Sequence, residues 1–349
     1  MAKGIGIFLV LLGHLQGDWF FSLSPIVLPL CTWIFSFHIP LFFIISGMLI
    51  NYRQDIVCDM KTLAGKRARS IMIPYLWFSL FYLLVVVYAL VKGSIQLPTL
   101  FLQLWYVLGL YGMNVLWFLP ALFLGEVLFL WIMKKSGRFA IPVIVFLTVS
   151  AILANRLLSS YSFDTAFSMR LNELAITLLR PFFTLAFIAC GYYMFALLKK
   201  EKKAVVTFVF GIVLLLVSIF VHPYNGGVDF RSLVQGNIAL YYISALAGSF
   251  GIILLCKIMP VIRPLSFLGA NSLIVMAVHN NETVLYLGMK LAMYANQYIT
   301  RARGYISYFI VVLIITLYCV LMIFVIKRFF PFIIGKPMHL KLLQRKKNE

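Results

Sequence analysis

The stretch SFHIPLFFIISG, residues 36–47, places a histidine and a proline inside an apolar segment long enough to cross a bilayer. Pro40 lacks a backbone donor and crowds the carbonyl of Ser36, so we expect a kinked helix with a polar carbonyl beside His38. An ionisable ring at this depth is costly unless it faces other protein or a cavity. The stretch therefore predicts a buried site at His38, with the rest of the chain forming its walls.

The composition indicates an all-α polytopic membrane protein. Of the 349 residues, 63% are hydrophobic and 11% are charged, and the mean hydropathy is +1.01, which is far too apolar for a soluble domain of this length. A net charge of +20 would suggest nucleic acid in a soluble protein. Here the basic residues lie in short clusters between apolar runs, so we expect membrane lipid around the chain and no nucleic-acid partner. The five cysteines are widely scattered, which indicates neither a metal site nor a disulfide framework.

Apolar runs long enough to span a bilayer predict about ten transmembrane helices. They lie near residues 5–22, 26–50, 71–91, 115–133, 139–157, 176–198, 204–222, 238–256, 266–289 and 305–326. No small-residue cleavage site follows the first run, so we interpret it as a retained helix and not as a signal peptide. With both termini in the cytoplasm, 22 of the 30 basic residues fall on the cytoplasmic side, as the positive-inside rule expects.

We expect residues 1–349 to form a single membrane domain, of which 330–349 are a basic cytoplasmic tail. Residues 94–113 are apolar but interrupted by Gly109 and Gly112. They predict an interfacial or re-entrant helix on the outer side and not an eleventh span, which would place the basic turns downstream outside.

A second histidine, His14, lies in the first apolar run, eleven residues after Lys3. Eleven steps of a helix return to nearly the same face about 16 Å along its axis, so a basic group should lie above a mid-membrane imidazole. Gly6, Gly13 and Gly17 share a related face, where another backbone can approach. The alternative is that His14 only forms a hydrogen bond across a helix interface, and two histidines in consecutive helices at similar depth weigh against it.

Several motifs together resemble the membrane-bound acyltransferase 3 family, and within it the fucose 4-O-acetylase branch most closely. The resemblance covers roughly residues 3–280. It rests on KGIG at 3–6, LGH at 12–14, FHIPLFF at 37–43, SG at 46–47, Arg67, Arg69, IPY at 73–75, LWFLPALF at 116–123, GN at 236–237, GANSL at 269–273 and His279.

The resemblance implies transfer of an acetyl or other short acyl group from cytoplasmic acyl-CoA to a sugar hydroxyl, usually on a glycan at or beyond the outer face. The donor is a substrate, and no bound cofactor is implied. The family's essential first-helix histidine is matched by His14. The basic residue eleven positions earlier, commonly arginine, is Lys3 here. The acidic residue that usually lies three positions before it falls ahead of Met1. The implied location is the cell membrane as a multi-pass protein, with the bacterial inner membrane expected.

The chemistry of the residues fits this implication, because an alcohol that attacks a thioester needs a base with a pKa near neutrality. We predict His14 as that base and His38 as its partner or a second proton carrier; a covalent acyl-histidine relay is the alternative. Glu126, in the middle of the predicted fourth span, is expected to orient an imidazole or hold a sugar hydroxyl. Its alternative is a purely structural pair with a basic residue.

Polar residues near the end of the predicted ninth span are candidates for binding the acceptor. We predict this role for His279, Asn280 and Glu282, together with Trp117 of the LWFLPALF motif. The alternative for the first three is a hydrated helix end. Arg180, next to Pro181, is expected to extend its side chain to the membrane interface.

The donor phosphates require cations at the inner face. Besides Lys3, we predict Arg53, Lys66, Arg67 and Arg69 as acyl-CoA ligands, because arginine binds phosphate in a bidentate manner. Attraction to anionic lipid explains the same charges equally well.

Two other functions remain open from the sequence. A transporter or flippase of a glycan or small organic anion would also need polar groups in the middle of the membrane. An inactive accessory subunit of a glycan assembly complex is the third possibility. Consumption of acyl-CoA separates an enzyme from a carrier, which moves its substrate unchanged.

Overall fold

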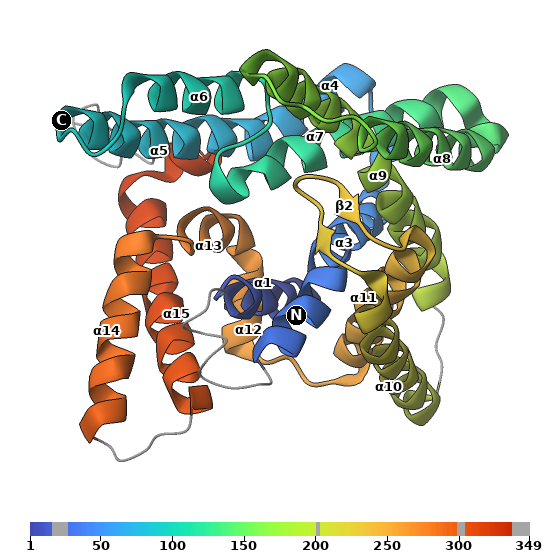
Figure 1. Ribbon diagram of the computed structural model, residues 1–349. Coiled ribbons are helices and arrows are strands. Elements are labelled where there is room, and N and C mark those ends of the chain that lie inside the picture. Colours follow the sequence, from blue (N-terminus) through green and yellow to red (C-terminus); the bar gives the residue numbers. More distant parts are fainter. Residues whose placement is uncertain (16–26, 200–202, 299–303, 337–349) are drawn as a thin grey trace, which may run out of the picture.

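The computed structural model of the chain describes residues 1–15, 27–199, 203–298 and 304–336. These residues form an almost entirely helical fold (Figure 1), which confirms the all-α prediction. The helices are α1 (Ala2–Gly13), α3 (Val27–Tyr52), α4 (Met60–Arg67), α5 (Ile73–Val91), α6 (Leu97–Leu108), α7 (Phe118–Ser136), α8 (Ala140–Leu158), α9 (Ala166–Lys199), α10 (Ala204–Val221), α11 (Ile238–Ile258), α12 (Arg263–Ala270), α13 (Ser272–Val278), α14 (Glu282–Tyr298) and α15 (Gly304–Phe329). Strands β1 (Val228–Asp229) and β2 (Val234–Gln235) pair as a short antiparallel hairpin.

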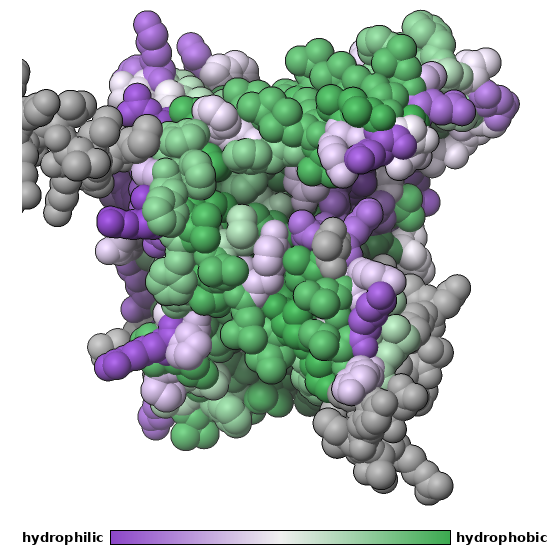
Figure 2. Space-filling model, turned by 90° about the vertical axis from the view of Figure 1, so that its left-hand side faces the viewer, coloured by the Kyte–Doolittle hydropathy of each residue, from purple (hydrophilic) through white to green (hydrophobic). Residues whose placement is uncertain are grey.

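The helices have the length and the surface of membrane spans. Within the described residues, 7 helical stretches are long and apolar enough to cross a bilayer, and shorter apolar helices accompany them. On α15, large apolar side chains recur on one exposed face, namely Phe309, Leu313, Leu317, Leu321 and Phe324. Figure 2 shows the side of the molecule formed by α14 and α15, where hydrophobic residues cover the middle and hydrophilic ones gather toward the edges. Such a face suits lipid and not water, so the chain is a polytopic membrane protein.

Most of the predicted spans correspond to helices. The runs near 26–50, 71–91, 204–222, 238–256 and 305–326 are α3, α5, α10, α11 and α15, and the run near 176–198 lies in α9, which already begins at Ala166. The runs near 115–133 and 139–157 form α7 and α8, joined by a turn in which Gly137 has φ 50°. The predicted helix 5–22 is described only as far as α1, which ends at Gly13; residues 16–22 lie outside the described part.

The prediction of one continuous span over 266–289 is wrong. Helix α12 ends at Ala270, α13 ends at Val278, and α14 is a separate helix that packs against α15. Polar side chains at these breaks bind nearby backbone groups and compete with the helix. The Asn271 Nδ2 donates to Phe267 O over 2.7 Å, and the Asn281 Oδ1 accepts from the backbone N–H of Val284 over 3.1 Å at the start of α14.

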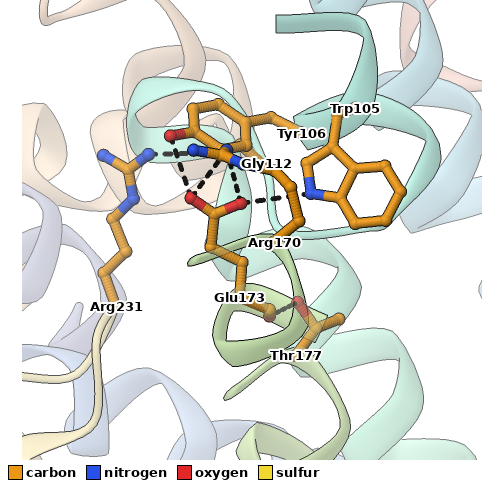
Figure 3. A network of polar contacts seen from close by, with 7 residues as sticks. All are labelled: Trp105, Tyr106, Gly112, Arg170, Glu173, Thr177 and Arg231. Atoms are coloured by element: carbon orange, nitrogen blue, oxygen red, sulfur yellow. Dashed lines mark hydrogen bonds and ion pairs between the residues drawn. The ribbon is translucent and has the colours of Figure 1, made fainter. Parts of the chain in front are cut away.

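Helix α6 is too short to span a membrane. Its 12 residues extend about 18 Å, against about 30 Å of hydrocarbon. It lies beside α5 (Figure 1) and is held to α9 by Glu173, which accepts hydrogen bonds from Trp105 Nε1 over 3.1 Å and from Tyr106 OH over 3.2 Å (Figure 3). The nearby Arg170 Nη1 forms an ion pair with the same carboxylate over 2.6 Å. This geometry agrees with an interfacial or re-entrant segment.

The long helix α3 forms the centre of the packing, because α1, α9 and α11 all contact it. Its crossing with α9 brings the two backbones together at glycines. A Cβ atom at Gly47 would lie 1.9 Å from Ile188 O, and a Cβ atom at Gly191 would lie 1.9 Å from Ile44 O. Only glycine allows this approach, and it fixes the position of His38 and Ser46 on α3 relative to the rest of the molecule.

Candidate active site

A cavity of about 260 Å³ lies between α1, α3, α7 and α13. His14 and His279 line one part of it, and Lys3, Arg53, Arg67 and Glu126 line another. Because Lys3 and His14 lie on one helix face eleven residues apart, about 16 Å separates the basic part from the imidazoles. Residues that are distant in the sequence therefore line one cavity. We call the part lined by Lys3, Arg53, Arg67 and Glu126 the charged end and the part lined by His14 and His279 the imidazole end.

At the imidazole end His14 and His279 line the cavity, and His38 on α3 lies beside His14 but is not among the cavity's described lining residues. His14 directly follows α1, where its backbone N–H still donates to Val10 O over 3.1 Å. Its ring centroid lies 4.8 Å from that of His279 and 6.3 Å from that of His38, both edge to face. The sequence predicted that His14 and His38 lie at similar depth; the structure adds His279 as the nearer neighbour of His14.

Backbone carbonyls determine which ring nitrogen of His38 and His279 carries the proton. The Nδ1 atom of His38 lies 2.8 Å from Ile34 O, and that of His279 lies 2.8 Å from Met276 O. A carbonyl can only accept, so both Nδ1 atoms are protonated and both Nε2 atoms keep a lone pair. Among the described residues, the buried Nε2 of His279 has no hydrogen-bond partner. The carbonyl beside His38 is that of Ile34 and not that of Ser36, which the sequence analysis expected.

At the charged end, Glu126 is 5% exposed on α7. Its Oε2 lies 2.6 Å from Arg67 Nε, and its Oε1 accepts a hydrogen bond from Ser46 on α3. Arg67 also pairs with Asp55, so one guanidinium joins two carboxylates. Within the described part of the chain, Glu126 contacts no imidazole, and its contacts match the alternative of a pair with a basic residue.

The local geometry of the chain directs Arg67 toward this cluster. Arg67 ends α4, and a π-helical turn, Ala68–Met72, joins α4 to α5. Such wide turns occur frequently at functional sites. Of the five predicted donor ligands, Lys3, Arg53 and Arg67 line the cavity.

Lys66 and Arg69 lie on exposed helix faces and are not among the cavity's described lining residues. Lys66 is one residue before Arg67 and Arg69 is two residues after it, so their side chains leave the helix about 100° and 200° away from that of Arg67. The predicted grouping of these cations holds only in part.

Of the four predicted acceptor-binding residues, two line the cavity and two lie outside its described lining. His279 and Trp117 line the cavity. Asn280 lies just beyond α13 and donates to the Asn114 side chain over 2.7 Å, and Glu282 is exposed at the start of α14. The break at the end of α13 carries these two residues away from the cavity.

The expectation that Arg180 extends to the membrane interface is wrong. The residue is 1% exposed in the middle of α9. Its Nη1 donates to Tyr111 O over 2.9 Å and its Nε to Arg231 O over 2.8 Å, while the guanidinium lies 5.4 Å from the centre of the Trp117 ring. Arg180 therefore joins two loops beside the wall of the cavity.

Two residues of the charged end were not predicted from the sequence: Ser46, which lines the cavity, and Asp55, which pairs with Arg67. Both had a signal: Ser46 lies in the stretch that carries His38, and Asp55 is one of only 10 acidic residues in the chain. A carboxylate this rare, two residues from Arg53, is a signal for an ion pair with one of the neighbouring basic residues. Among the described residues, no group of three or more His, Cys, Asp or Glu side chains could hold a metal ion.

Comparison with known families settles the class of the protein. A family model described as an acyltransferase domain matches residues 1–326. The chain belongs to the acyltransferase 3 family. No curated protein and no solved structure matches it. All the residues of the cavity lie inside the matched range, and this membrane acyltransferase is an enzyme.

Proposed function

We propose that this acyltransferase moves an acetyl or other short acyl group from acyl-CoA to a hydroxyl of a carbohydrate, in the manner of a fucose 4-O-acetylase. The observation that carries the proposal is a single cavity lined both by cations and by imidazoles. The pantetheine arm of CoA separates phosphates from a thioester by a length comparable to the distance between Lys3 and His14. Phosphates at the charged end would thus place the thioester at the histidines.

The charge of the cluster assigns different tasks to its cations. Arg67 is paired with Asp55 and Glu126, so its charge is already balanced. Lys3 and Arg53 also line the cavity, and Arg53 is exposed at its edge. We expect these two side chains to bind the phosphates, while Arg67 holds α4 and α7 together.

The reaction needs one base. The hydroxyl oxygen of the acceptor attacks the thioester carbonyl, its proton passes to an imidazole nitrogen of His14, and the C–S bond breaks as the CoA thiolate leaves and takes up that proton. A positioned imidazole contributes typically 10²–10⁴-fold to such a step. His279 lies nearest to His14, with ring centroids 4.8 Å apart, and its Nε2 keeps a lone pair that can accept a hydrogen bond from a substrate hydroxyl or from the base.

Release of free CoA tests this function in purified protein. With acetyl-CoA and a glycan acceptor, we expect His14→Ala to lower kcat by at least about 100-fold. Lys3→Ala and Arg53→Ala should raise KM for acetyl-CoA with little change in kcat. Lys92→Ala is the matched control, because Lys92 is exposed beyond α5 and lies outside the cavity's described lining.

The acyl-histidine alternative predicts a labelled protein when acetyl-CoA is supplied without acceptor. A folded protein that releases no CoA with any acceptor in a broad glycan panel would contradict the proposal.

A further inference from the structure

A second cavity, of about 480 Å³, lies away from the histidines and is called the hairpin groove here. Its walls are the end of α8, the start of α9 and the β1–β2 hairpin, with polar lining residues Asn155, Arg156, Ser159, Tyr161, Asn172, Ser232 and Gln235. Among the described residues, none lines both this groove and the central cavity. The volume falls within the range of small-molecule sites.

The groove lies at the end of α8 that is far from the basic helix α4 and from Lys134. Lys134, at the end of α7, donates to Cys58 O beside the basic helix α4. Since α8 runs back from the turn at Gly137, its far end, Leu158, reaches the other side. There Asn155 Nδ2 donates to Leu233 O over 3.0 Å and fixes the hairpin against α8.

The hairpin joins the groove to the wall of the central cavity. Its turn carries Phe230, which is 5% exposed and stacks on Trp117 with ring centroids 5.9 Å apart. Trp117 lines the central cavity, while Leu233, Val234 and Gln235 of the hairpin line the groove. A ligand in the groove would therefore lie against the segment that packs on a wall residue of the central cavity.

One side chain of the groove carries a buried donor without a partner among the described residues. Gln235 is 7% exposed, and among the described residues its Nε2 has no hydrogen-bond partner. A buried amide without a partner is destabilising and rare in folded proteins. Gln235 lines the groove, so a bound molecule that reaches this amide would supply the acceptor.

The chemistry of the groove favours a neutral polyhydroxylated ligand. Its polar lining consists of three amides and three hydroxyls besides Arg156, with no carboxylate among the described lining residues, and Phe163 adds a second aromatic ring to that of Tyr161. Arg156 already donates to Gly236 O over 3.4 Å. Amides and hydroxyls serve sugar hydroxyls as donors and acceptors, whereas an anionic headgroup would need more cations.

We propose that the hairpin groove is a carbohydrate-binding site, which holds part of the glycan acceptor beside the hairpin that packs on Trp117 of the central cavity. This inference rests on the carbohydrate acceptor of the proposed function. It assigns a site to that acceptor outside the cavity that contains the histidines.

Binding without acyl-CoA tests the groove separately from catalysis. The probe is a panel of fluorescent oligosaccharides of hexoses, deoxyhexoses and N-acetylhexosamines, titrated against the full chain in nanodiscs of neutral lipid. We expect at least one sugar to bind, and Gln235→Met and Tyr161→Ala each to weaken it about ten-fold or more. Tyr224→Ala is the matched control, because Tyr224 is 74% exposed in the same region and lies outside the groove's lining.

Two further measurements make the outcome decisive. Gln235→Met keeps the linear shape of the side chain and removes its unpaired amide, so the thermal unfolding midpoint should stay equal or rise while binding falls. His14→Ala should bind the sugar as the parent does, and sugar binding without CoA release would refute the proposed function and leave the groove intact. The inference is overturned if no sugar binds, if both groove variants bind normally, or if anionic lipid displaces the sugar from the groove.

Discussion

At the residue scale, the arrangement of three imidazoles is the feature that chemistry must explain. His38 and His279 are each 2% exposed, and carbonyls one turn earlier orient both rings. A buried acceptor without a partner costs about 1–3 kcal/mol. The free Nε2 of His279, in a ring 4.8 Å from that of His14, is therefore expected to find its partner when a substrate or the protonated base is present.

The contact between His279 and His14 gives the first prediction. We expect His279→Ala to lower kcat by about 10–100-fold with an unchanged KM for acetyl-CoA, because it removes an acceptor beside the base and leaves the phosphate end intact. His279→Gln, whose amide oxygen can accept, should restore part of the loss. His222→Ala is the control, since His222 follows α10 and contacts Ile219 O. Equal losses in the alanine and glutamine variants would contradict a role for the acceptor.

The ion pair between Glu126 and Arg67 gives the second prediction. Glu126→Gln keeps the side-chain shape and the contact with Ser46 but removes the charge that faces Arg67. Removing one partner of a buried pair costs about 3–5 kcal/mol, and the remaining Asp55 contact should reduce this to about 2 kcal/mol. Thermal unfolding in detergent should show a midpoint several degrees lower than that of the exposed control Glu282→Gln. An unchanged midpoint would mean that the pair is not formed.

At the element scale, backbone contact between α3 and α9 positions the wall that carries His38 and Ser46. A methyl group at Gly191 would lie 1.9 Å from a carbonyl oxygen of α3, a distance that neither rigid backbone can relieve by rotating a side chain. The two helices would have to move apart, and the site would widen.

The third prediction follows from this crossing. Gly191→Ala should lower both the unfolding midpoint and the acyltransferase activity, because the overpacked helices separate. Gly65→Ala is the matched control: Gly65 lies in α4, and nothing lies within 4 Å of its Cβ position, so alanine should be neutral or stabilise by up to about 1 kcal/mol. Equal thermal stability of the two variants would refute the close crossing.

The elements were largely predictable from the sequence where hydropathy alone decides them. Continuous apolar runs predicted α3, α5, α10, α11 and α15 closely. The prediction failed at 266–289. The average hydropathy of that run stays high although Asn271 and the polar residues after Val278 interrupt the helix. A π-helical turn such as Ala68–Met72 has no signature in the hydropathy of the sequence. The sequence therefore did not indicate that Arg67, and not Lys66 or Arg69, lines the cavity.

The sequence predicted which types of residue form the candidate site, but it did not predict which of them contact one another. A histidine in an apolar run is a signal by itself, and this found His14, His38 and His279. The contacts of Glu126 depend on Arg67 and Ser46 arriving from two other helices, which no spacing within one helix can reveal. Burial of Arg180 was missed for the same reason, because its partners are carbonyls in two distant loops.

At the scale of the whole molecule, the fold separates a basic side from a side that carries the hairpin groove. Contacts between helix ends define the first: Asn51 Nδ2 donates to Tyr192 O over 3.0 Å, and Lys257 Nζ donates to Leu198 O over 2.6 Å. The β1–β2 hairpin and the end of α8 define the second. In the function proposed above, acyl-CoA would approach the central cavity from the first side and the glycan from the second.

The fourth prediction tests this topology. Lys61→Cys and Ser160→Cys both introduce an exposed thiol, on the basic side and on the hairpin side respectively. The positive-inside rule places the first in the cytoplasm. A membrane-impermeant maleimide should label only Ser160→Cys in intact cells and should label both after permeabilisation. The reverse pattern in intact cells would contradict the orientation.

Transfer of label from donor to glycan tests the central claim most directly. Membranes that contain the full chain or its His14→Ala variant would receive acetyl-CoA with a radiolabelled acetyl group on the cytoplasmic side, and incorporation into envelope glycan would be counted. We predict incorporation by the parent chain and a loss of at least about 100-fold in the variant, at equal protein abundance and equal acetyl-CoA binding. Undiminished incorporation by His14→Ala would contradict a catalytic imidazole in this cavity.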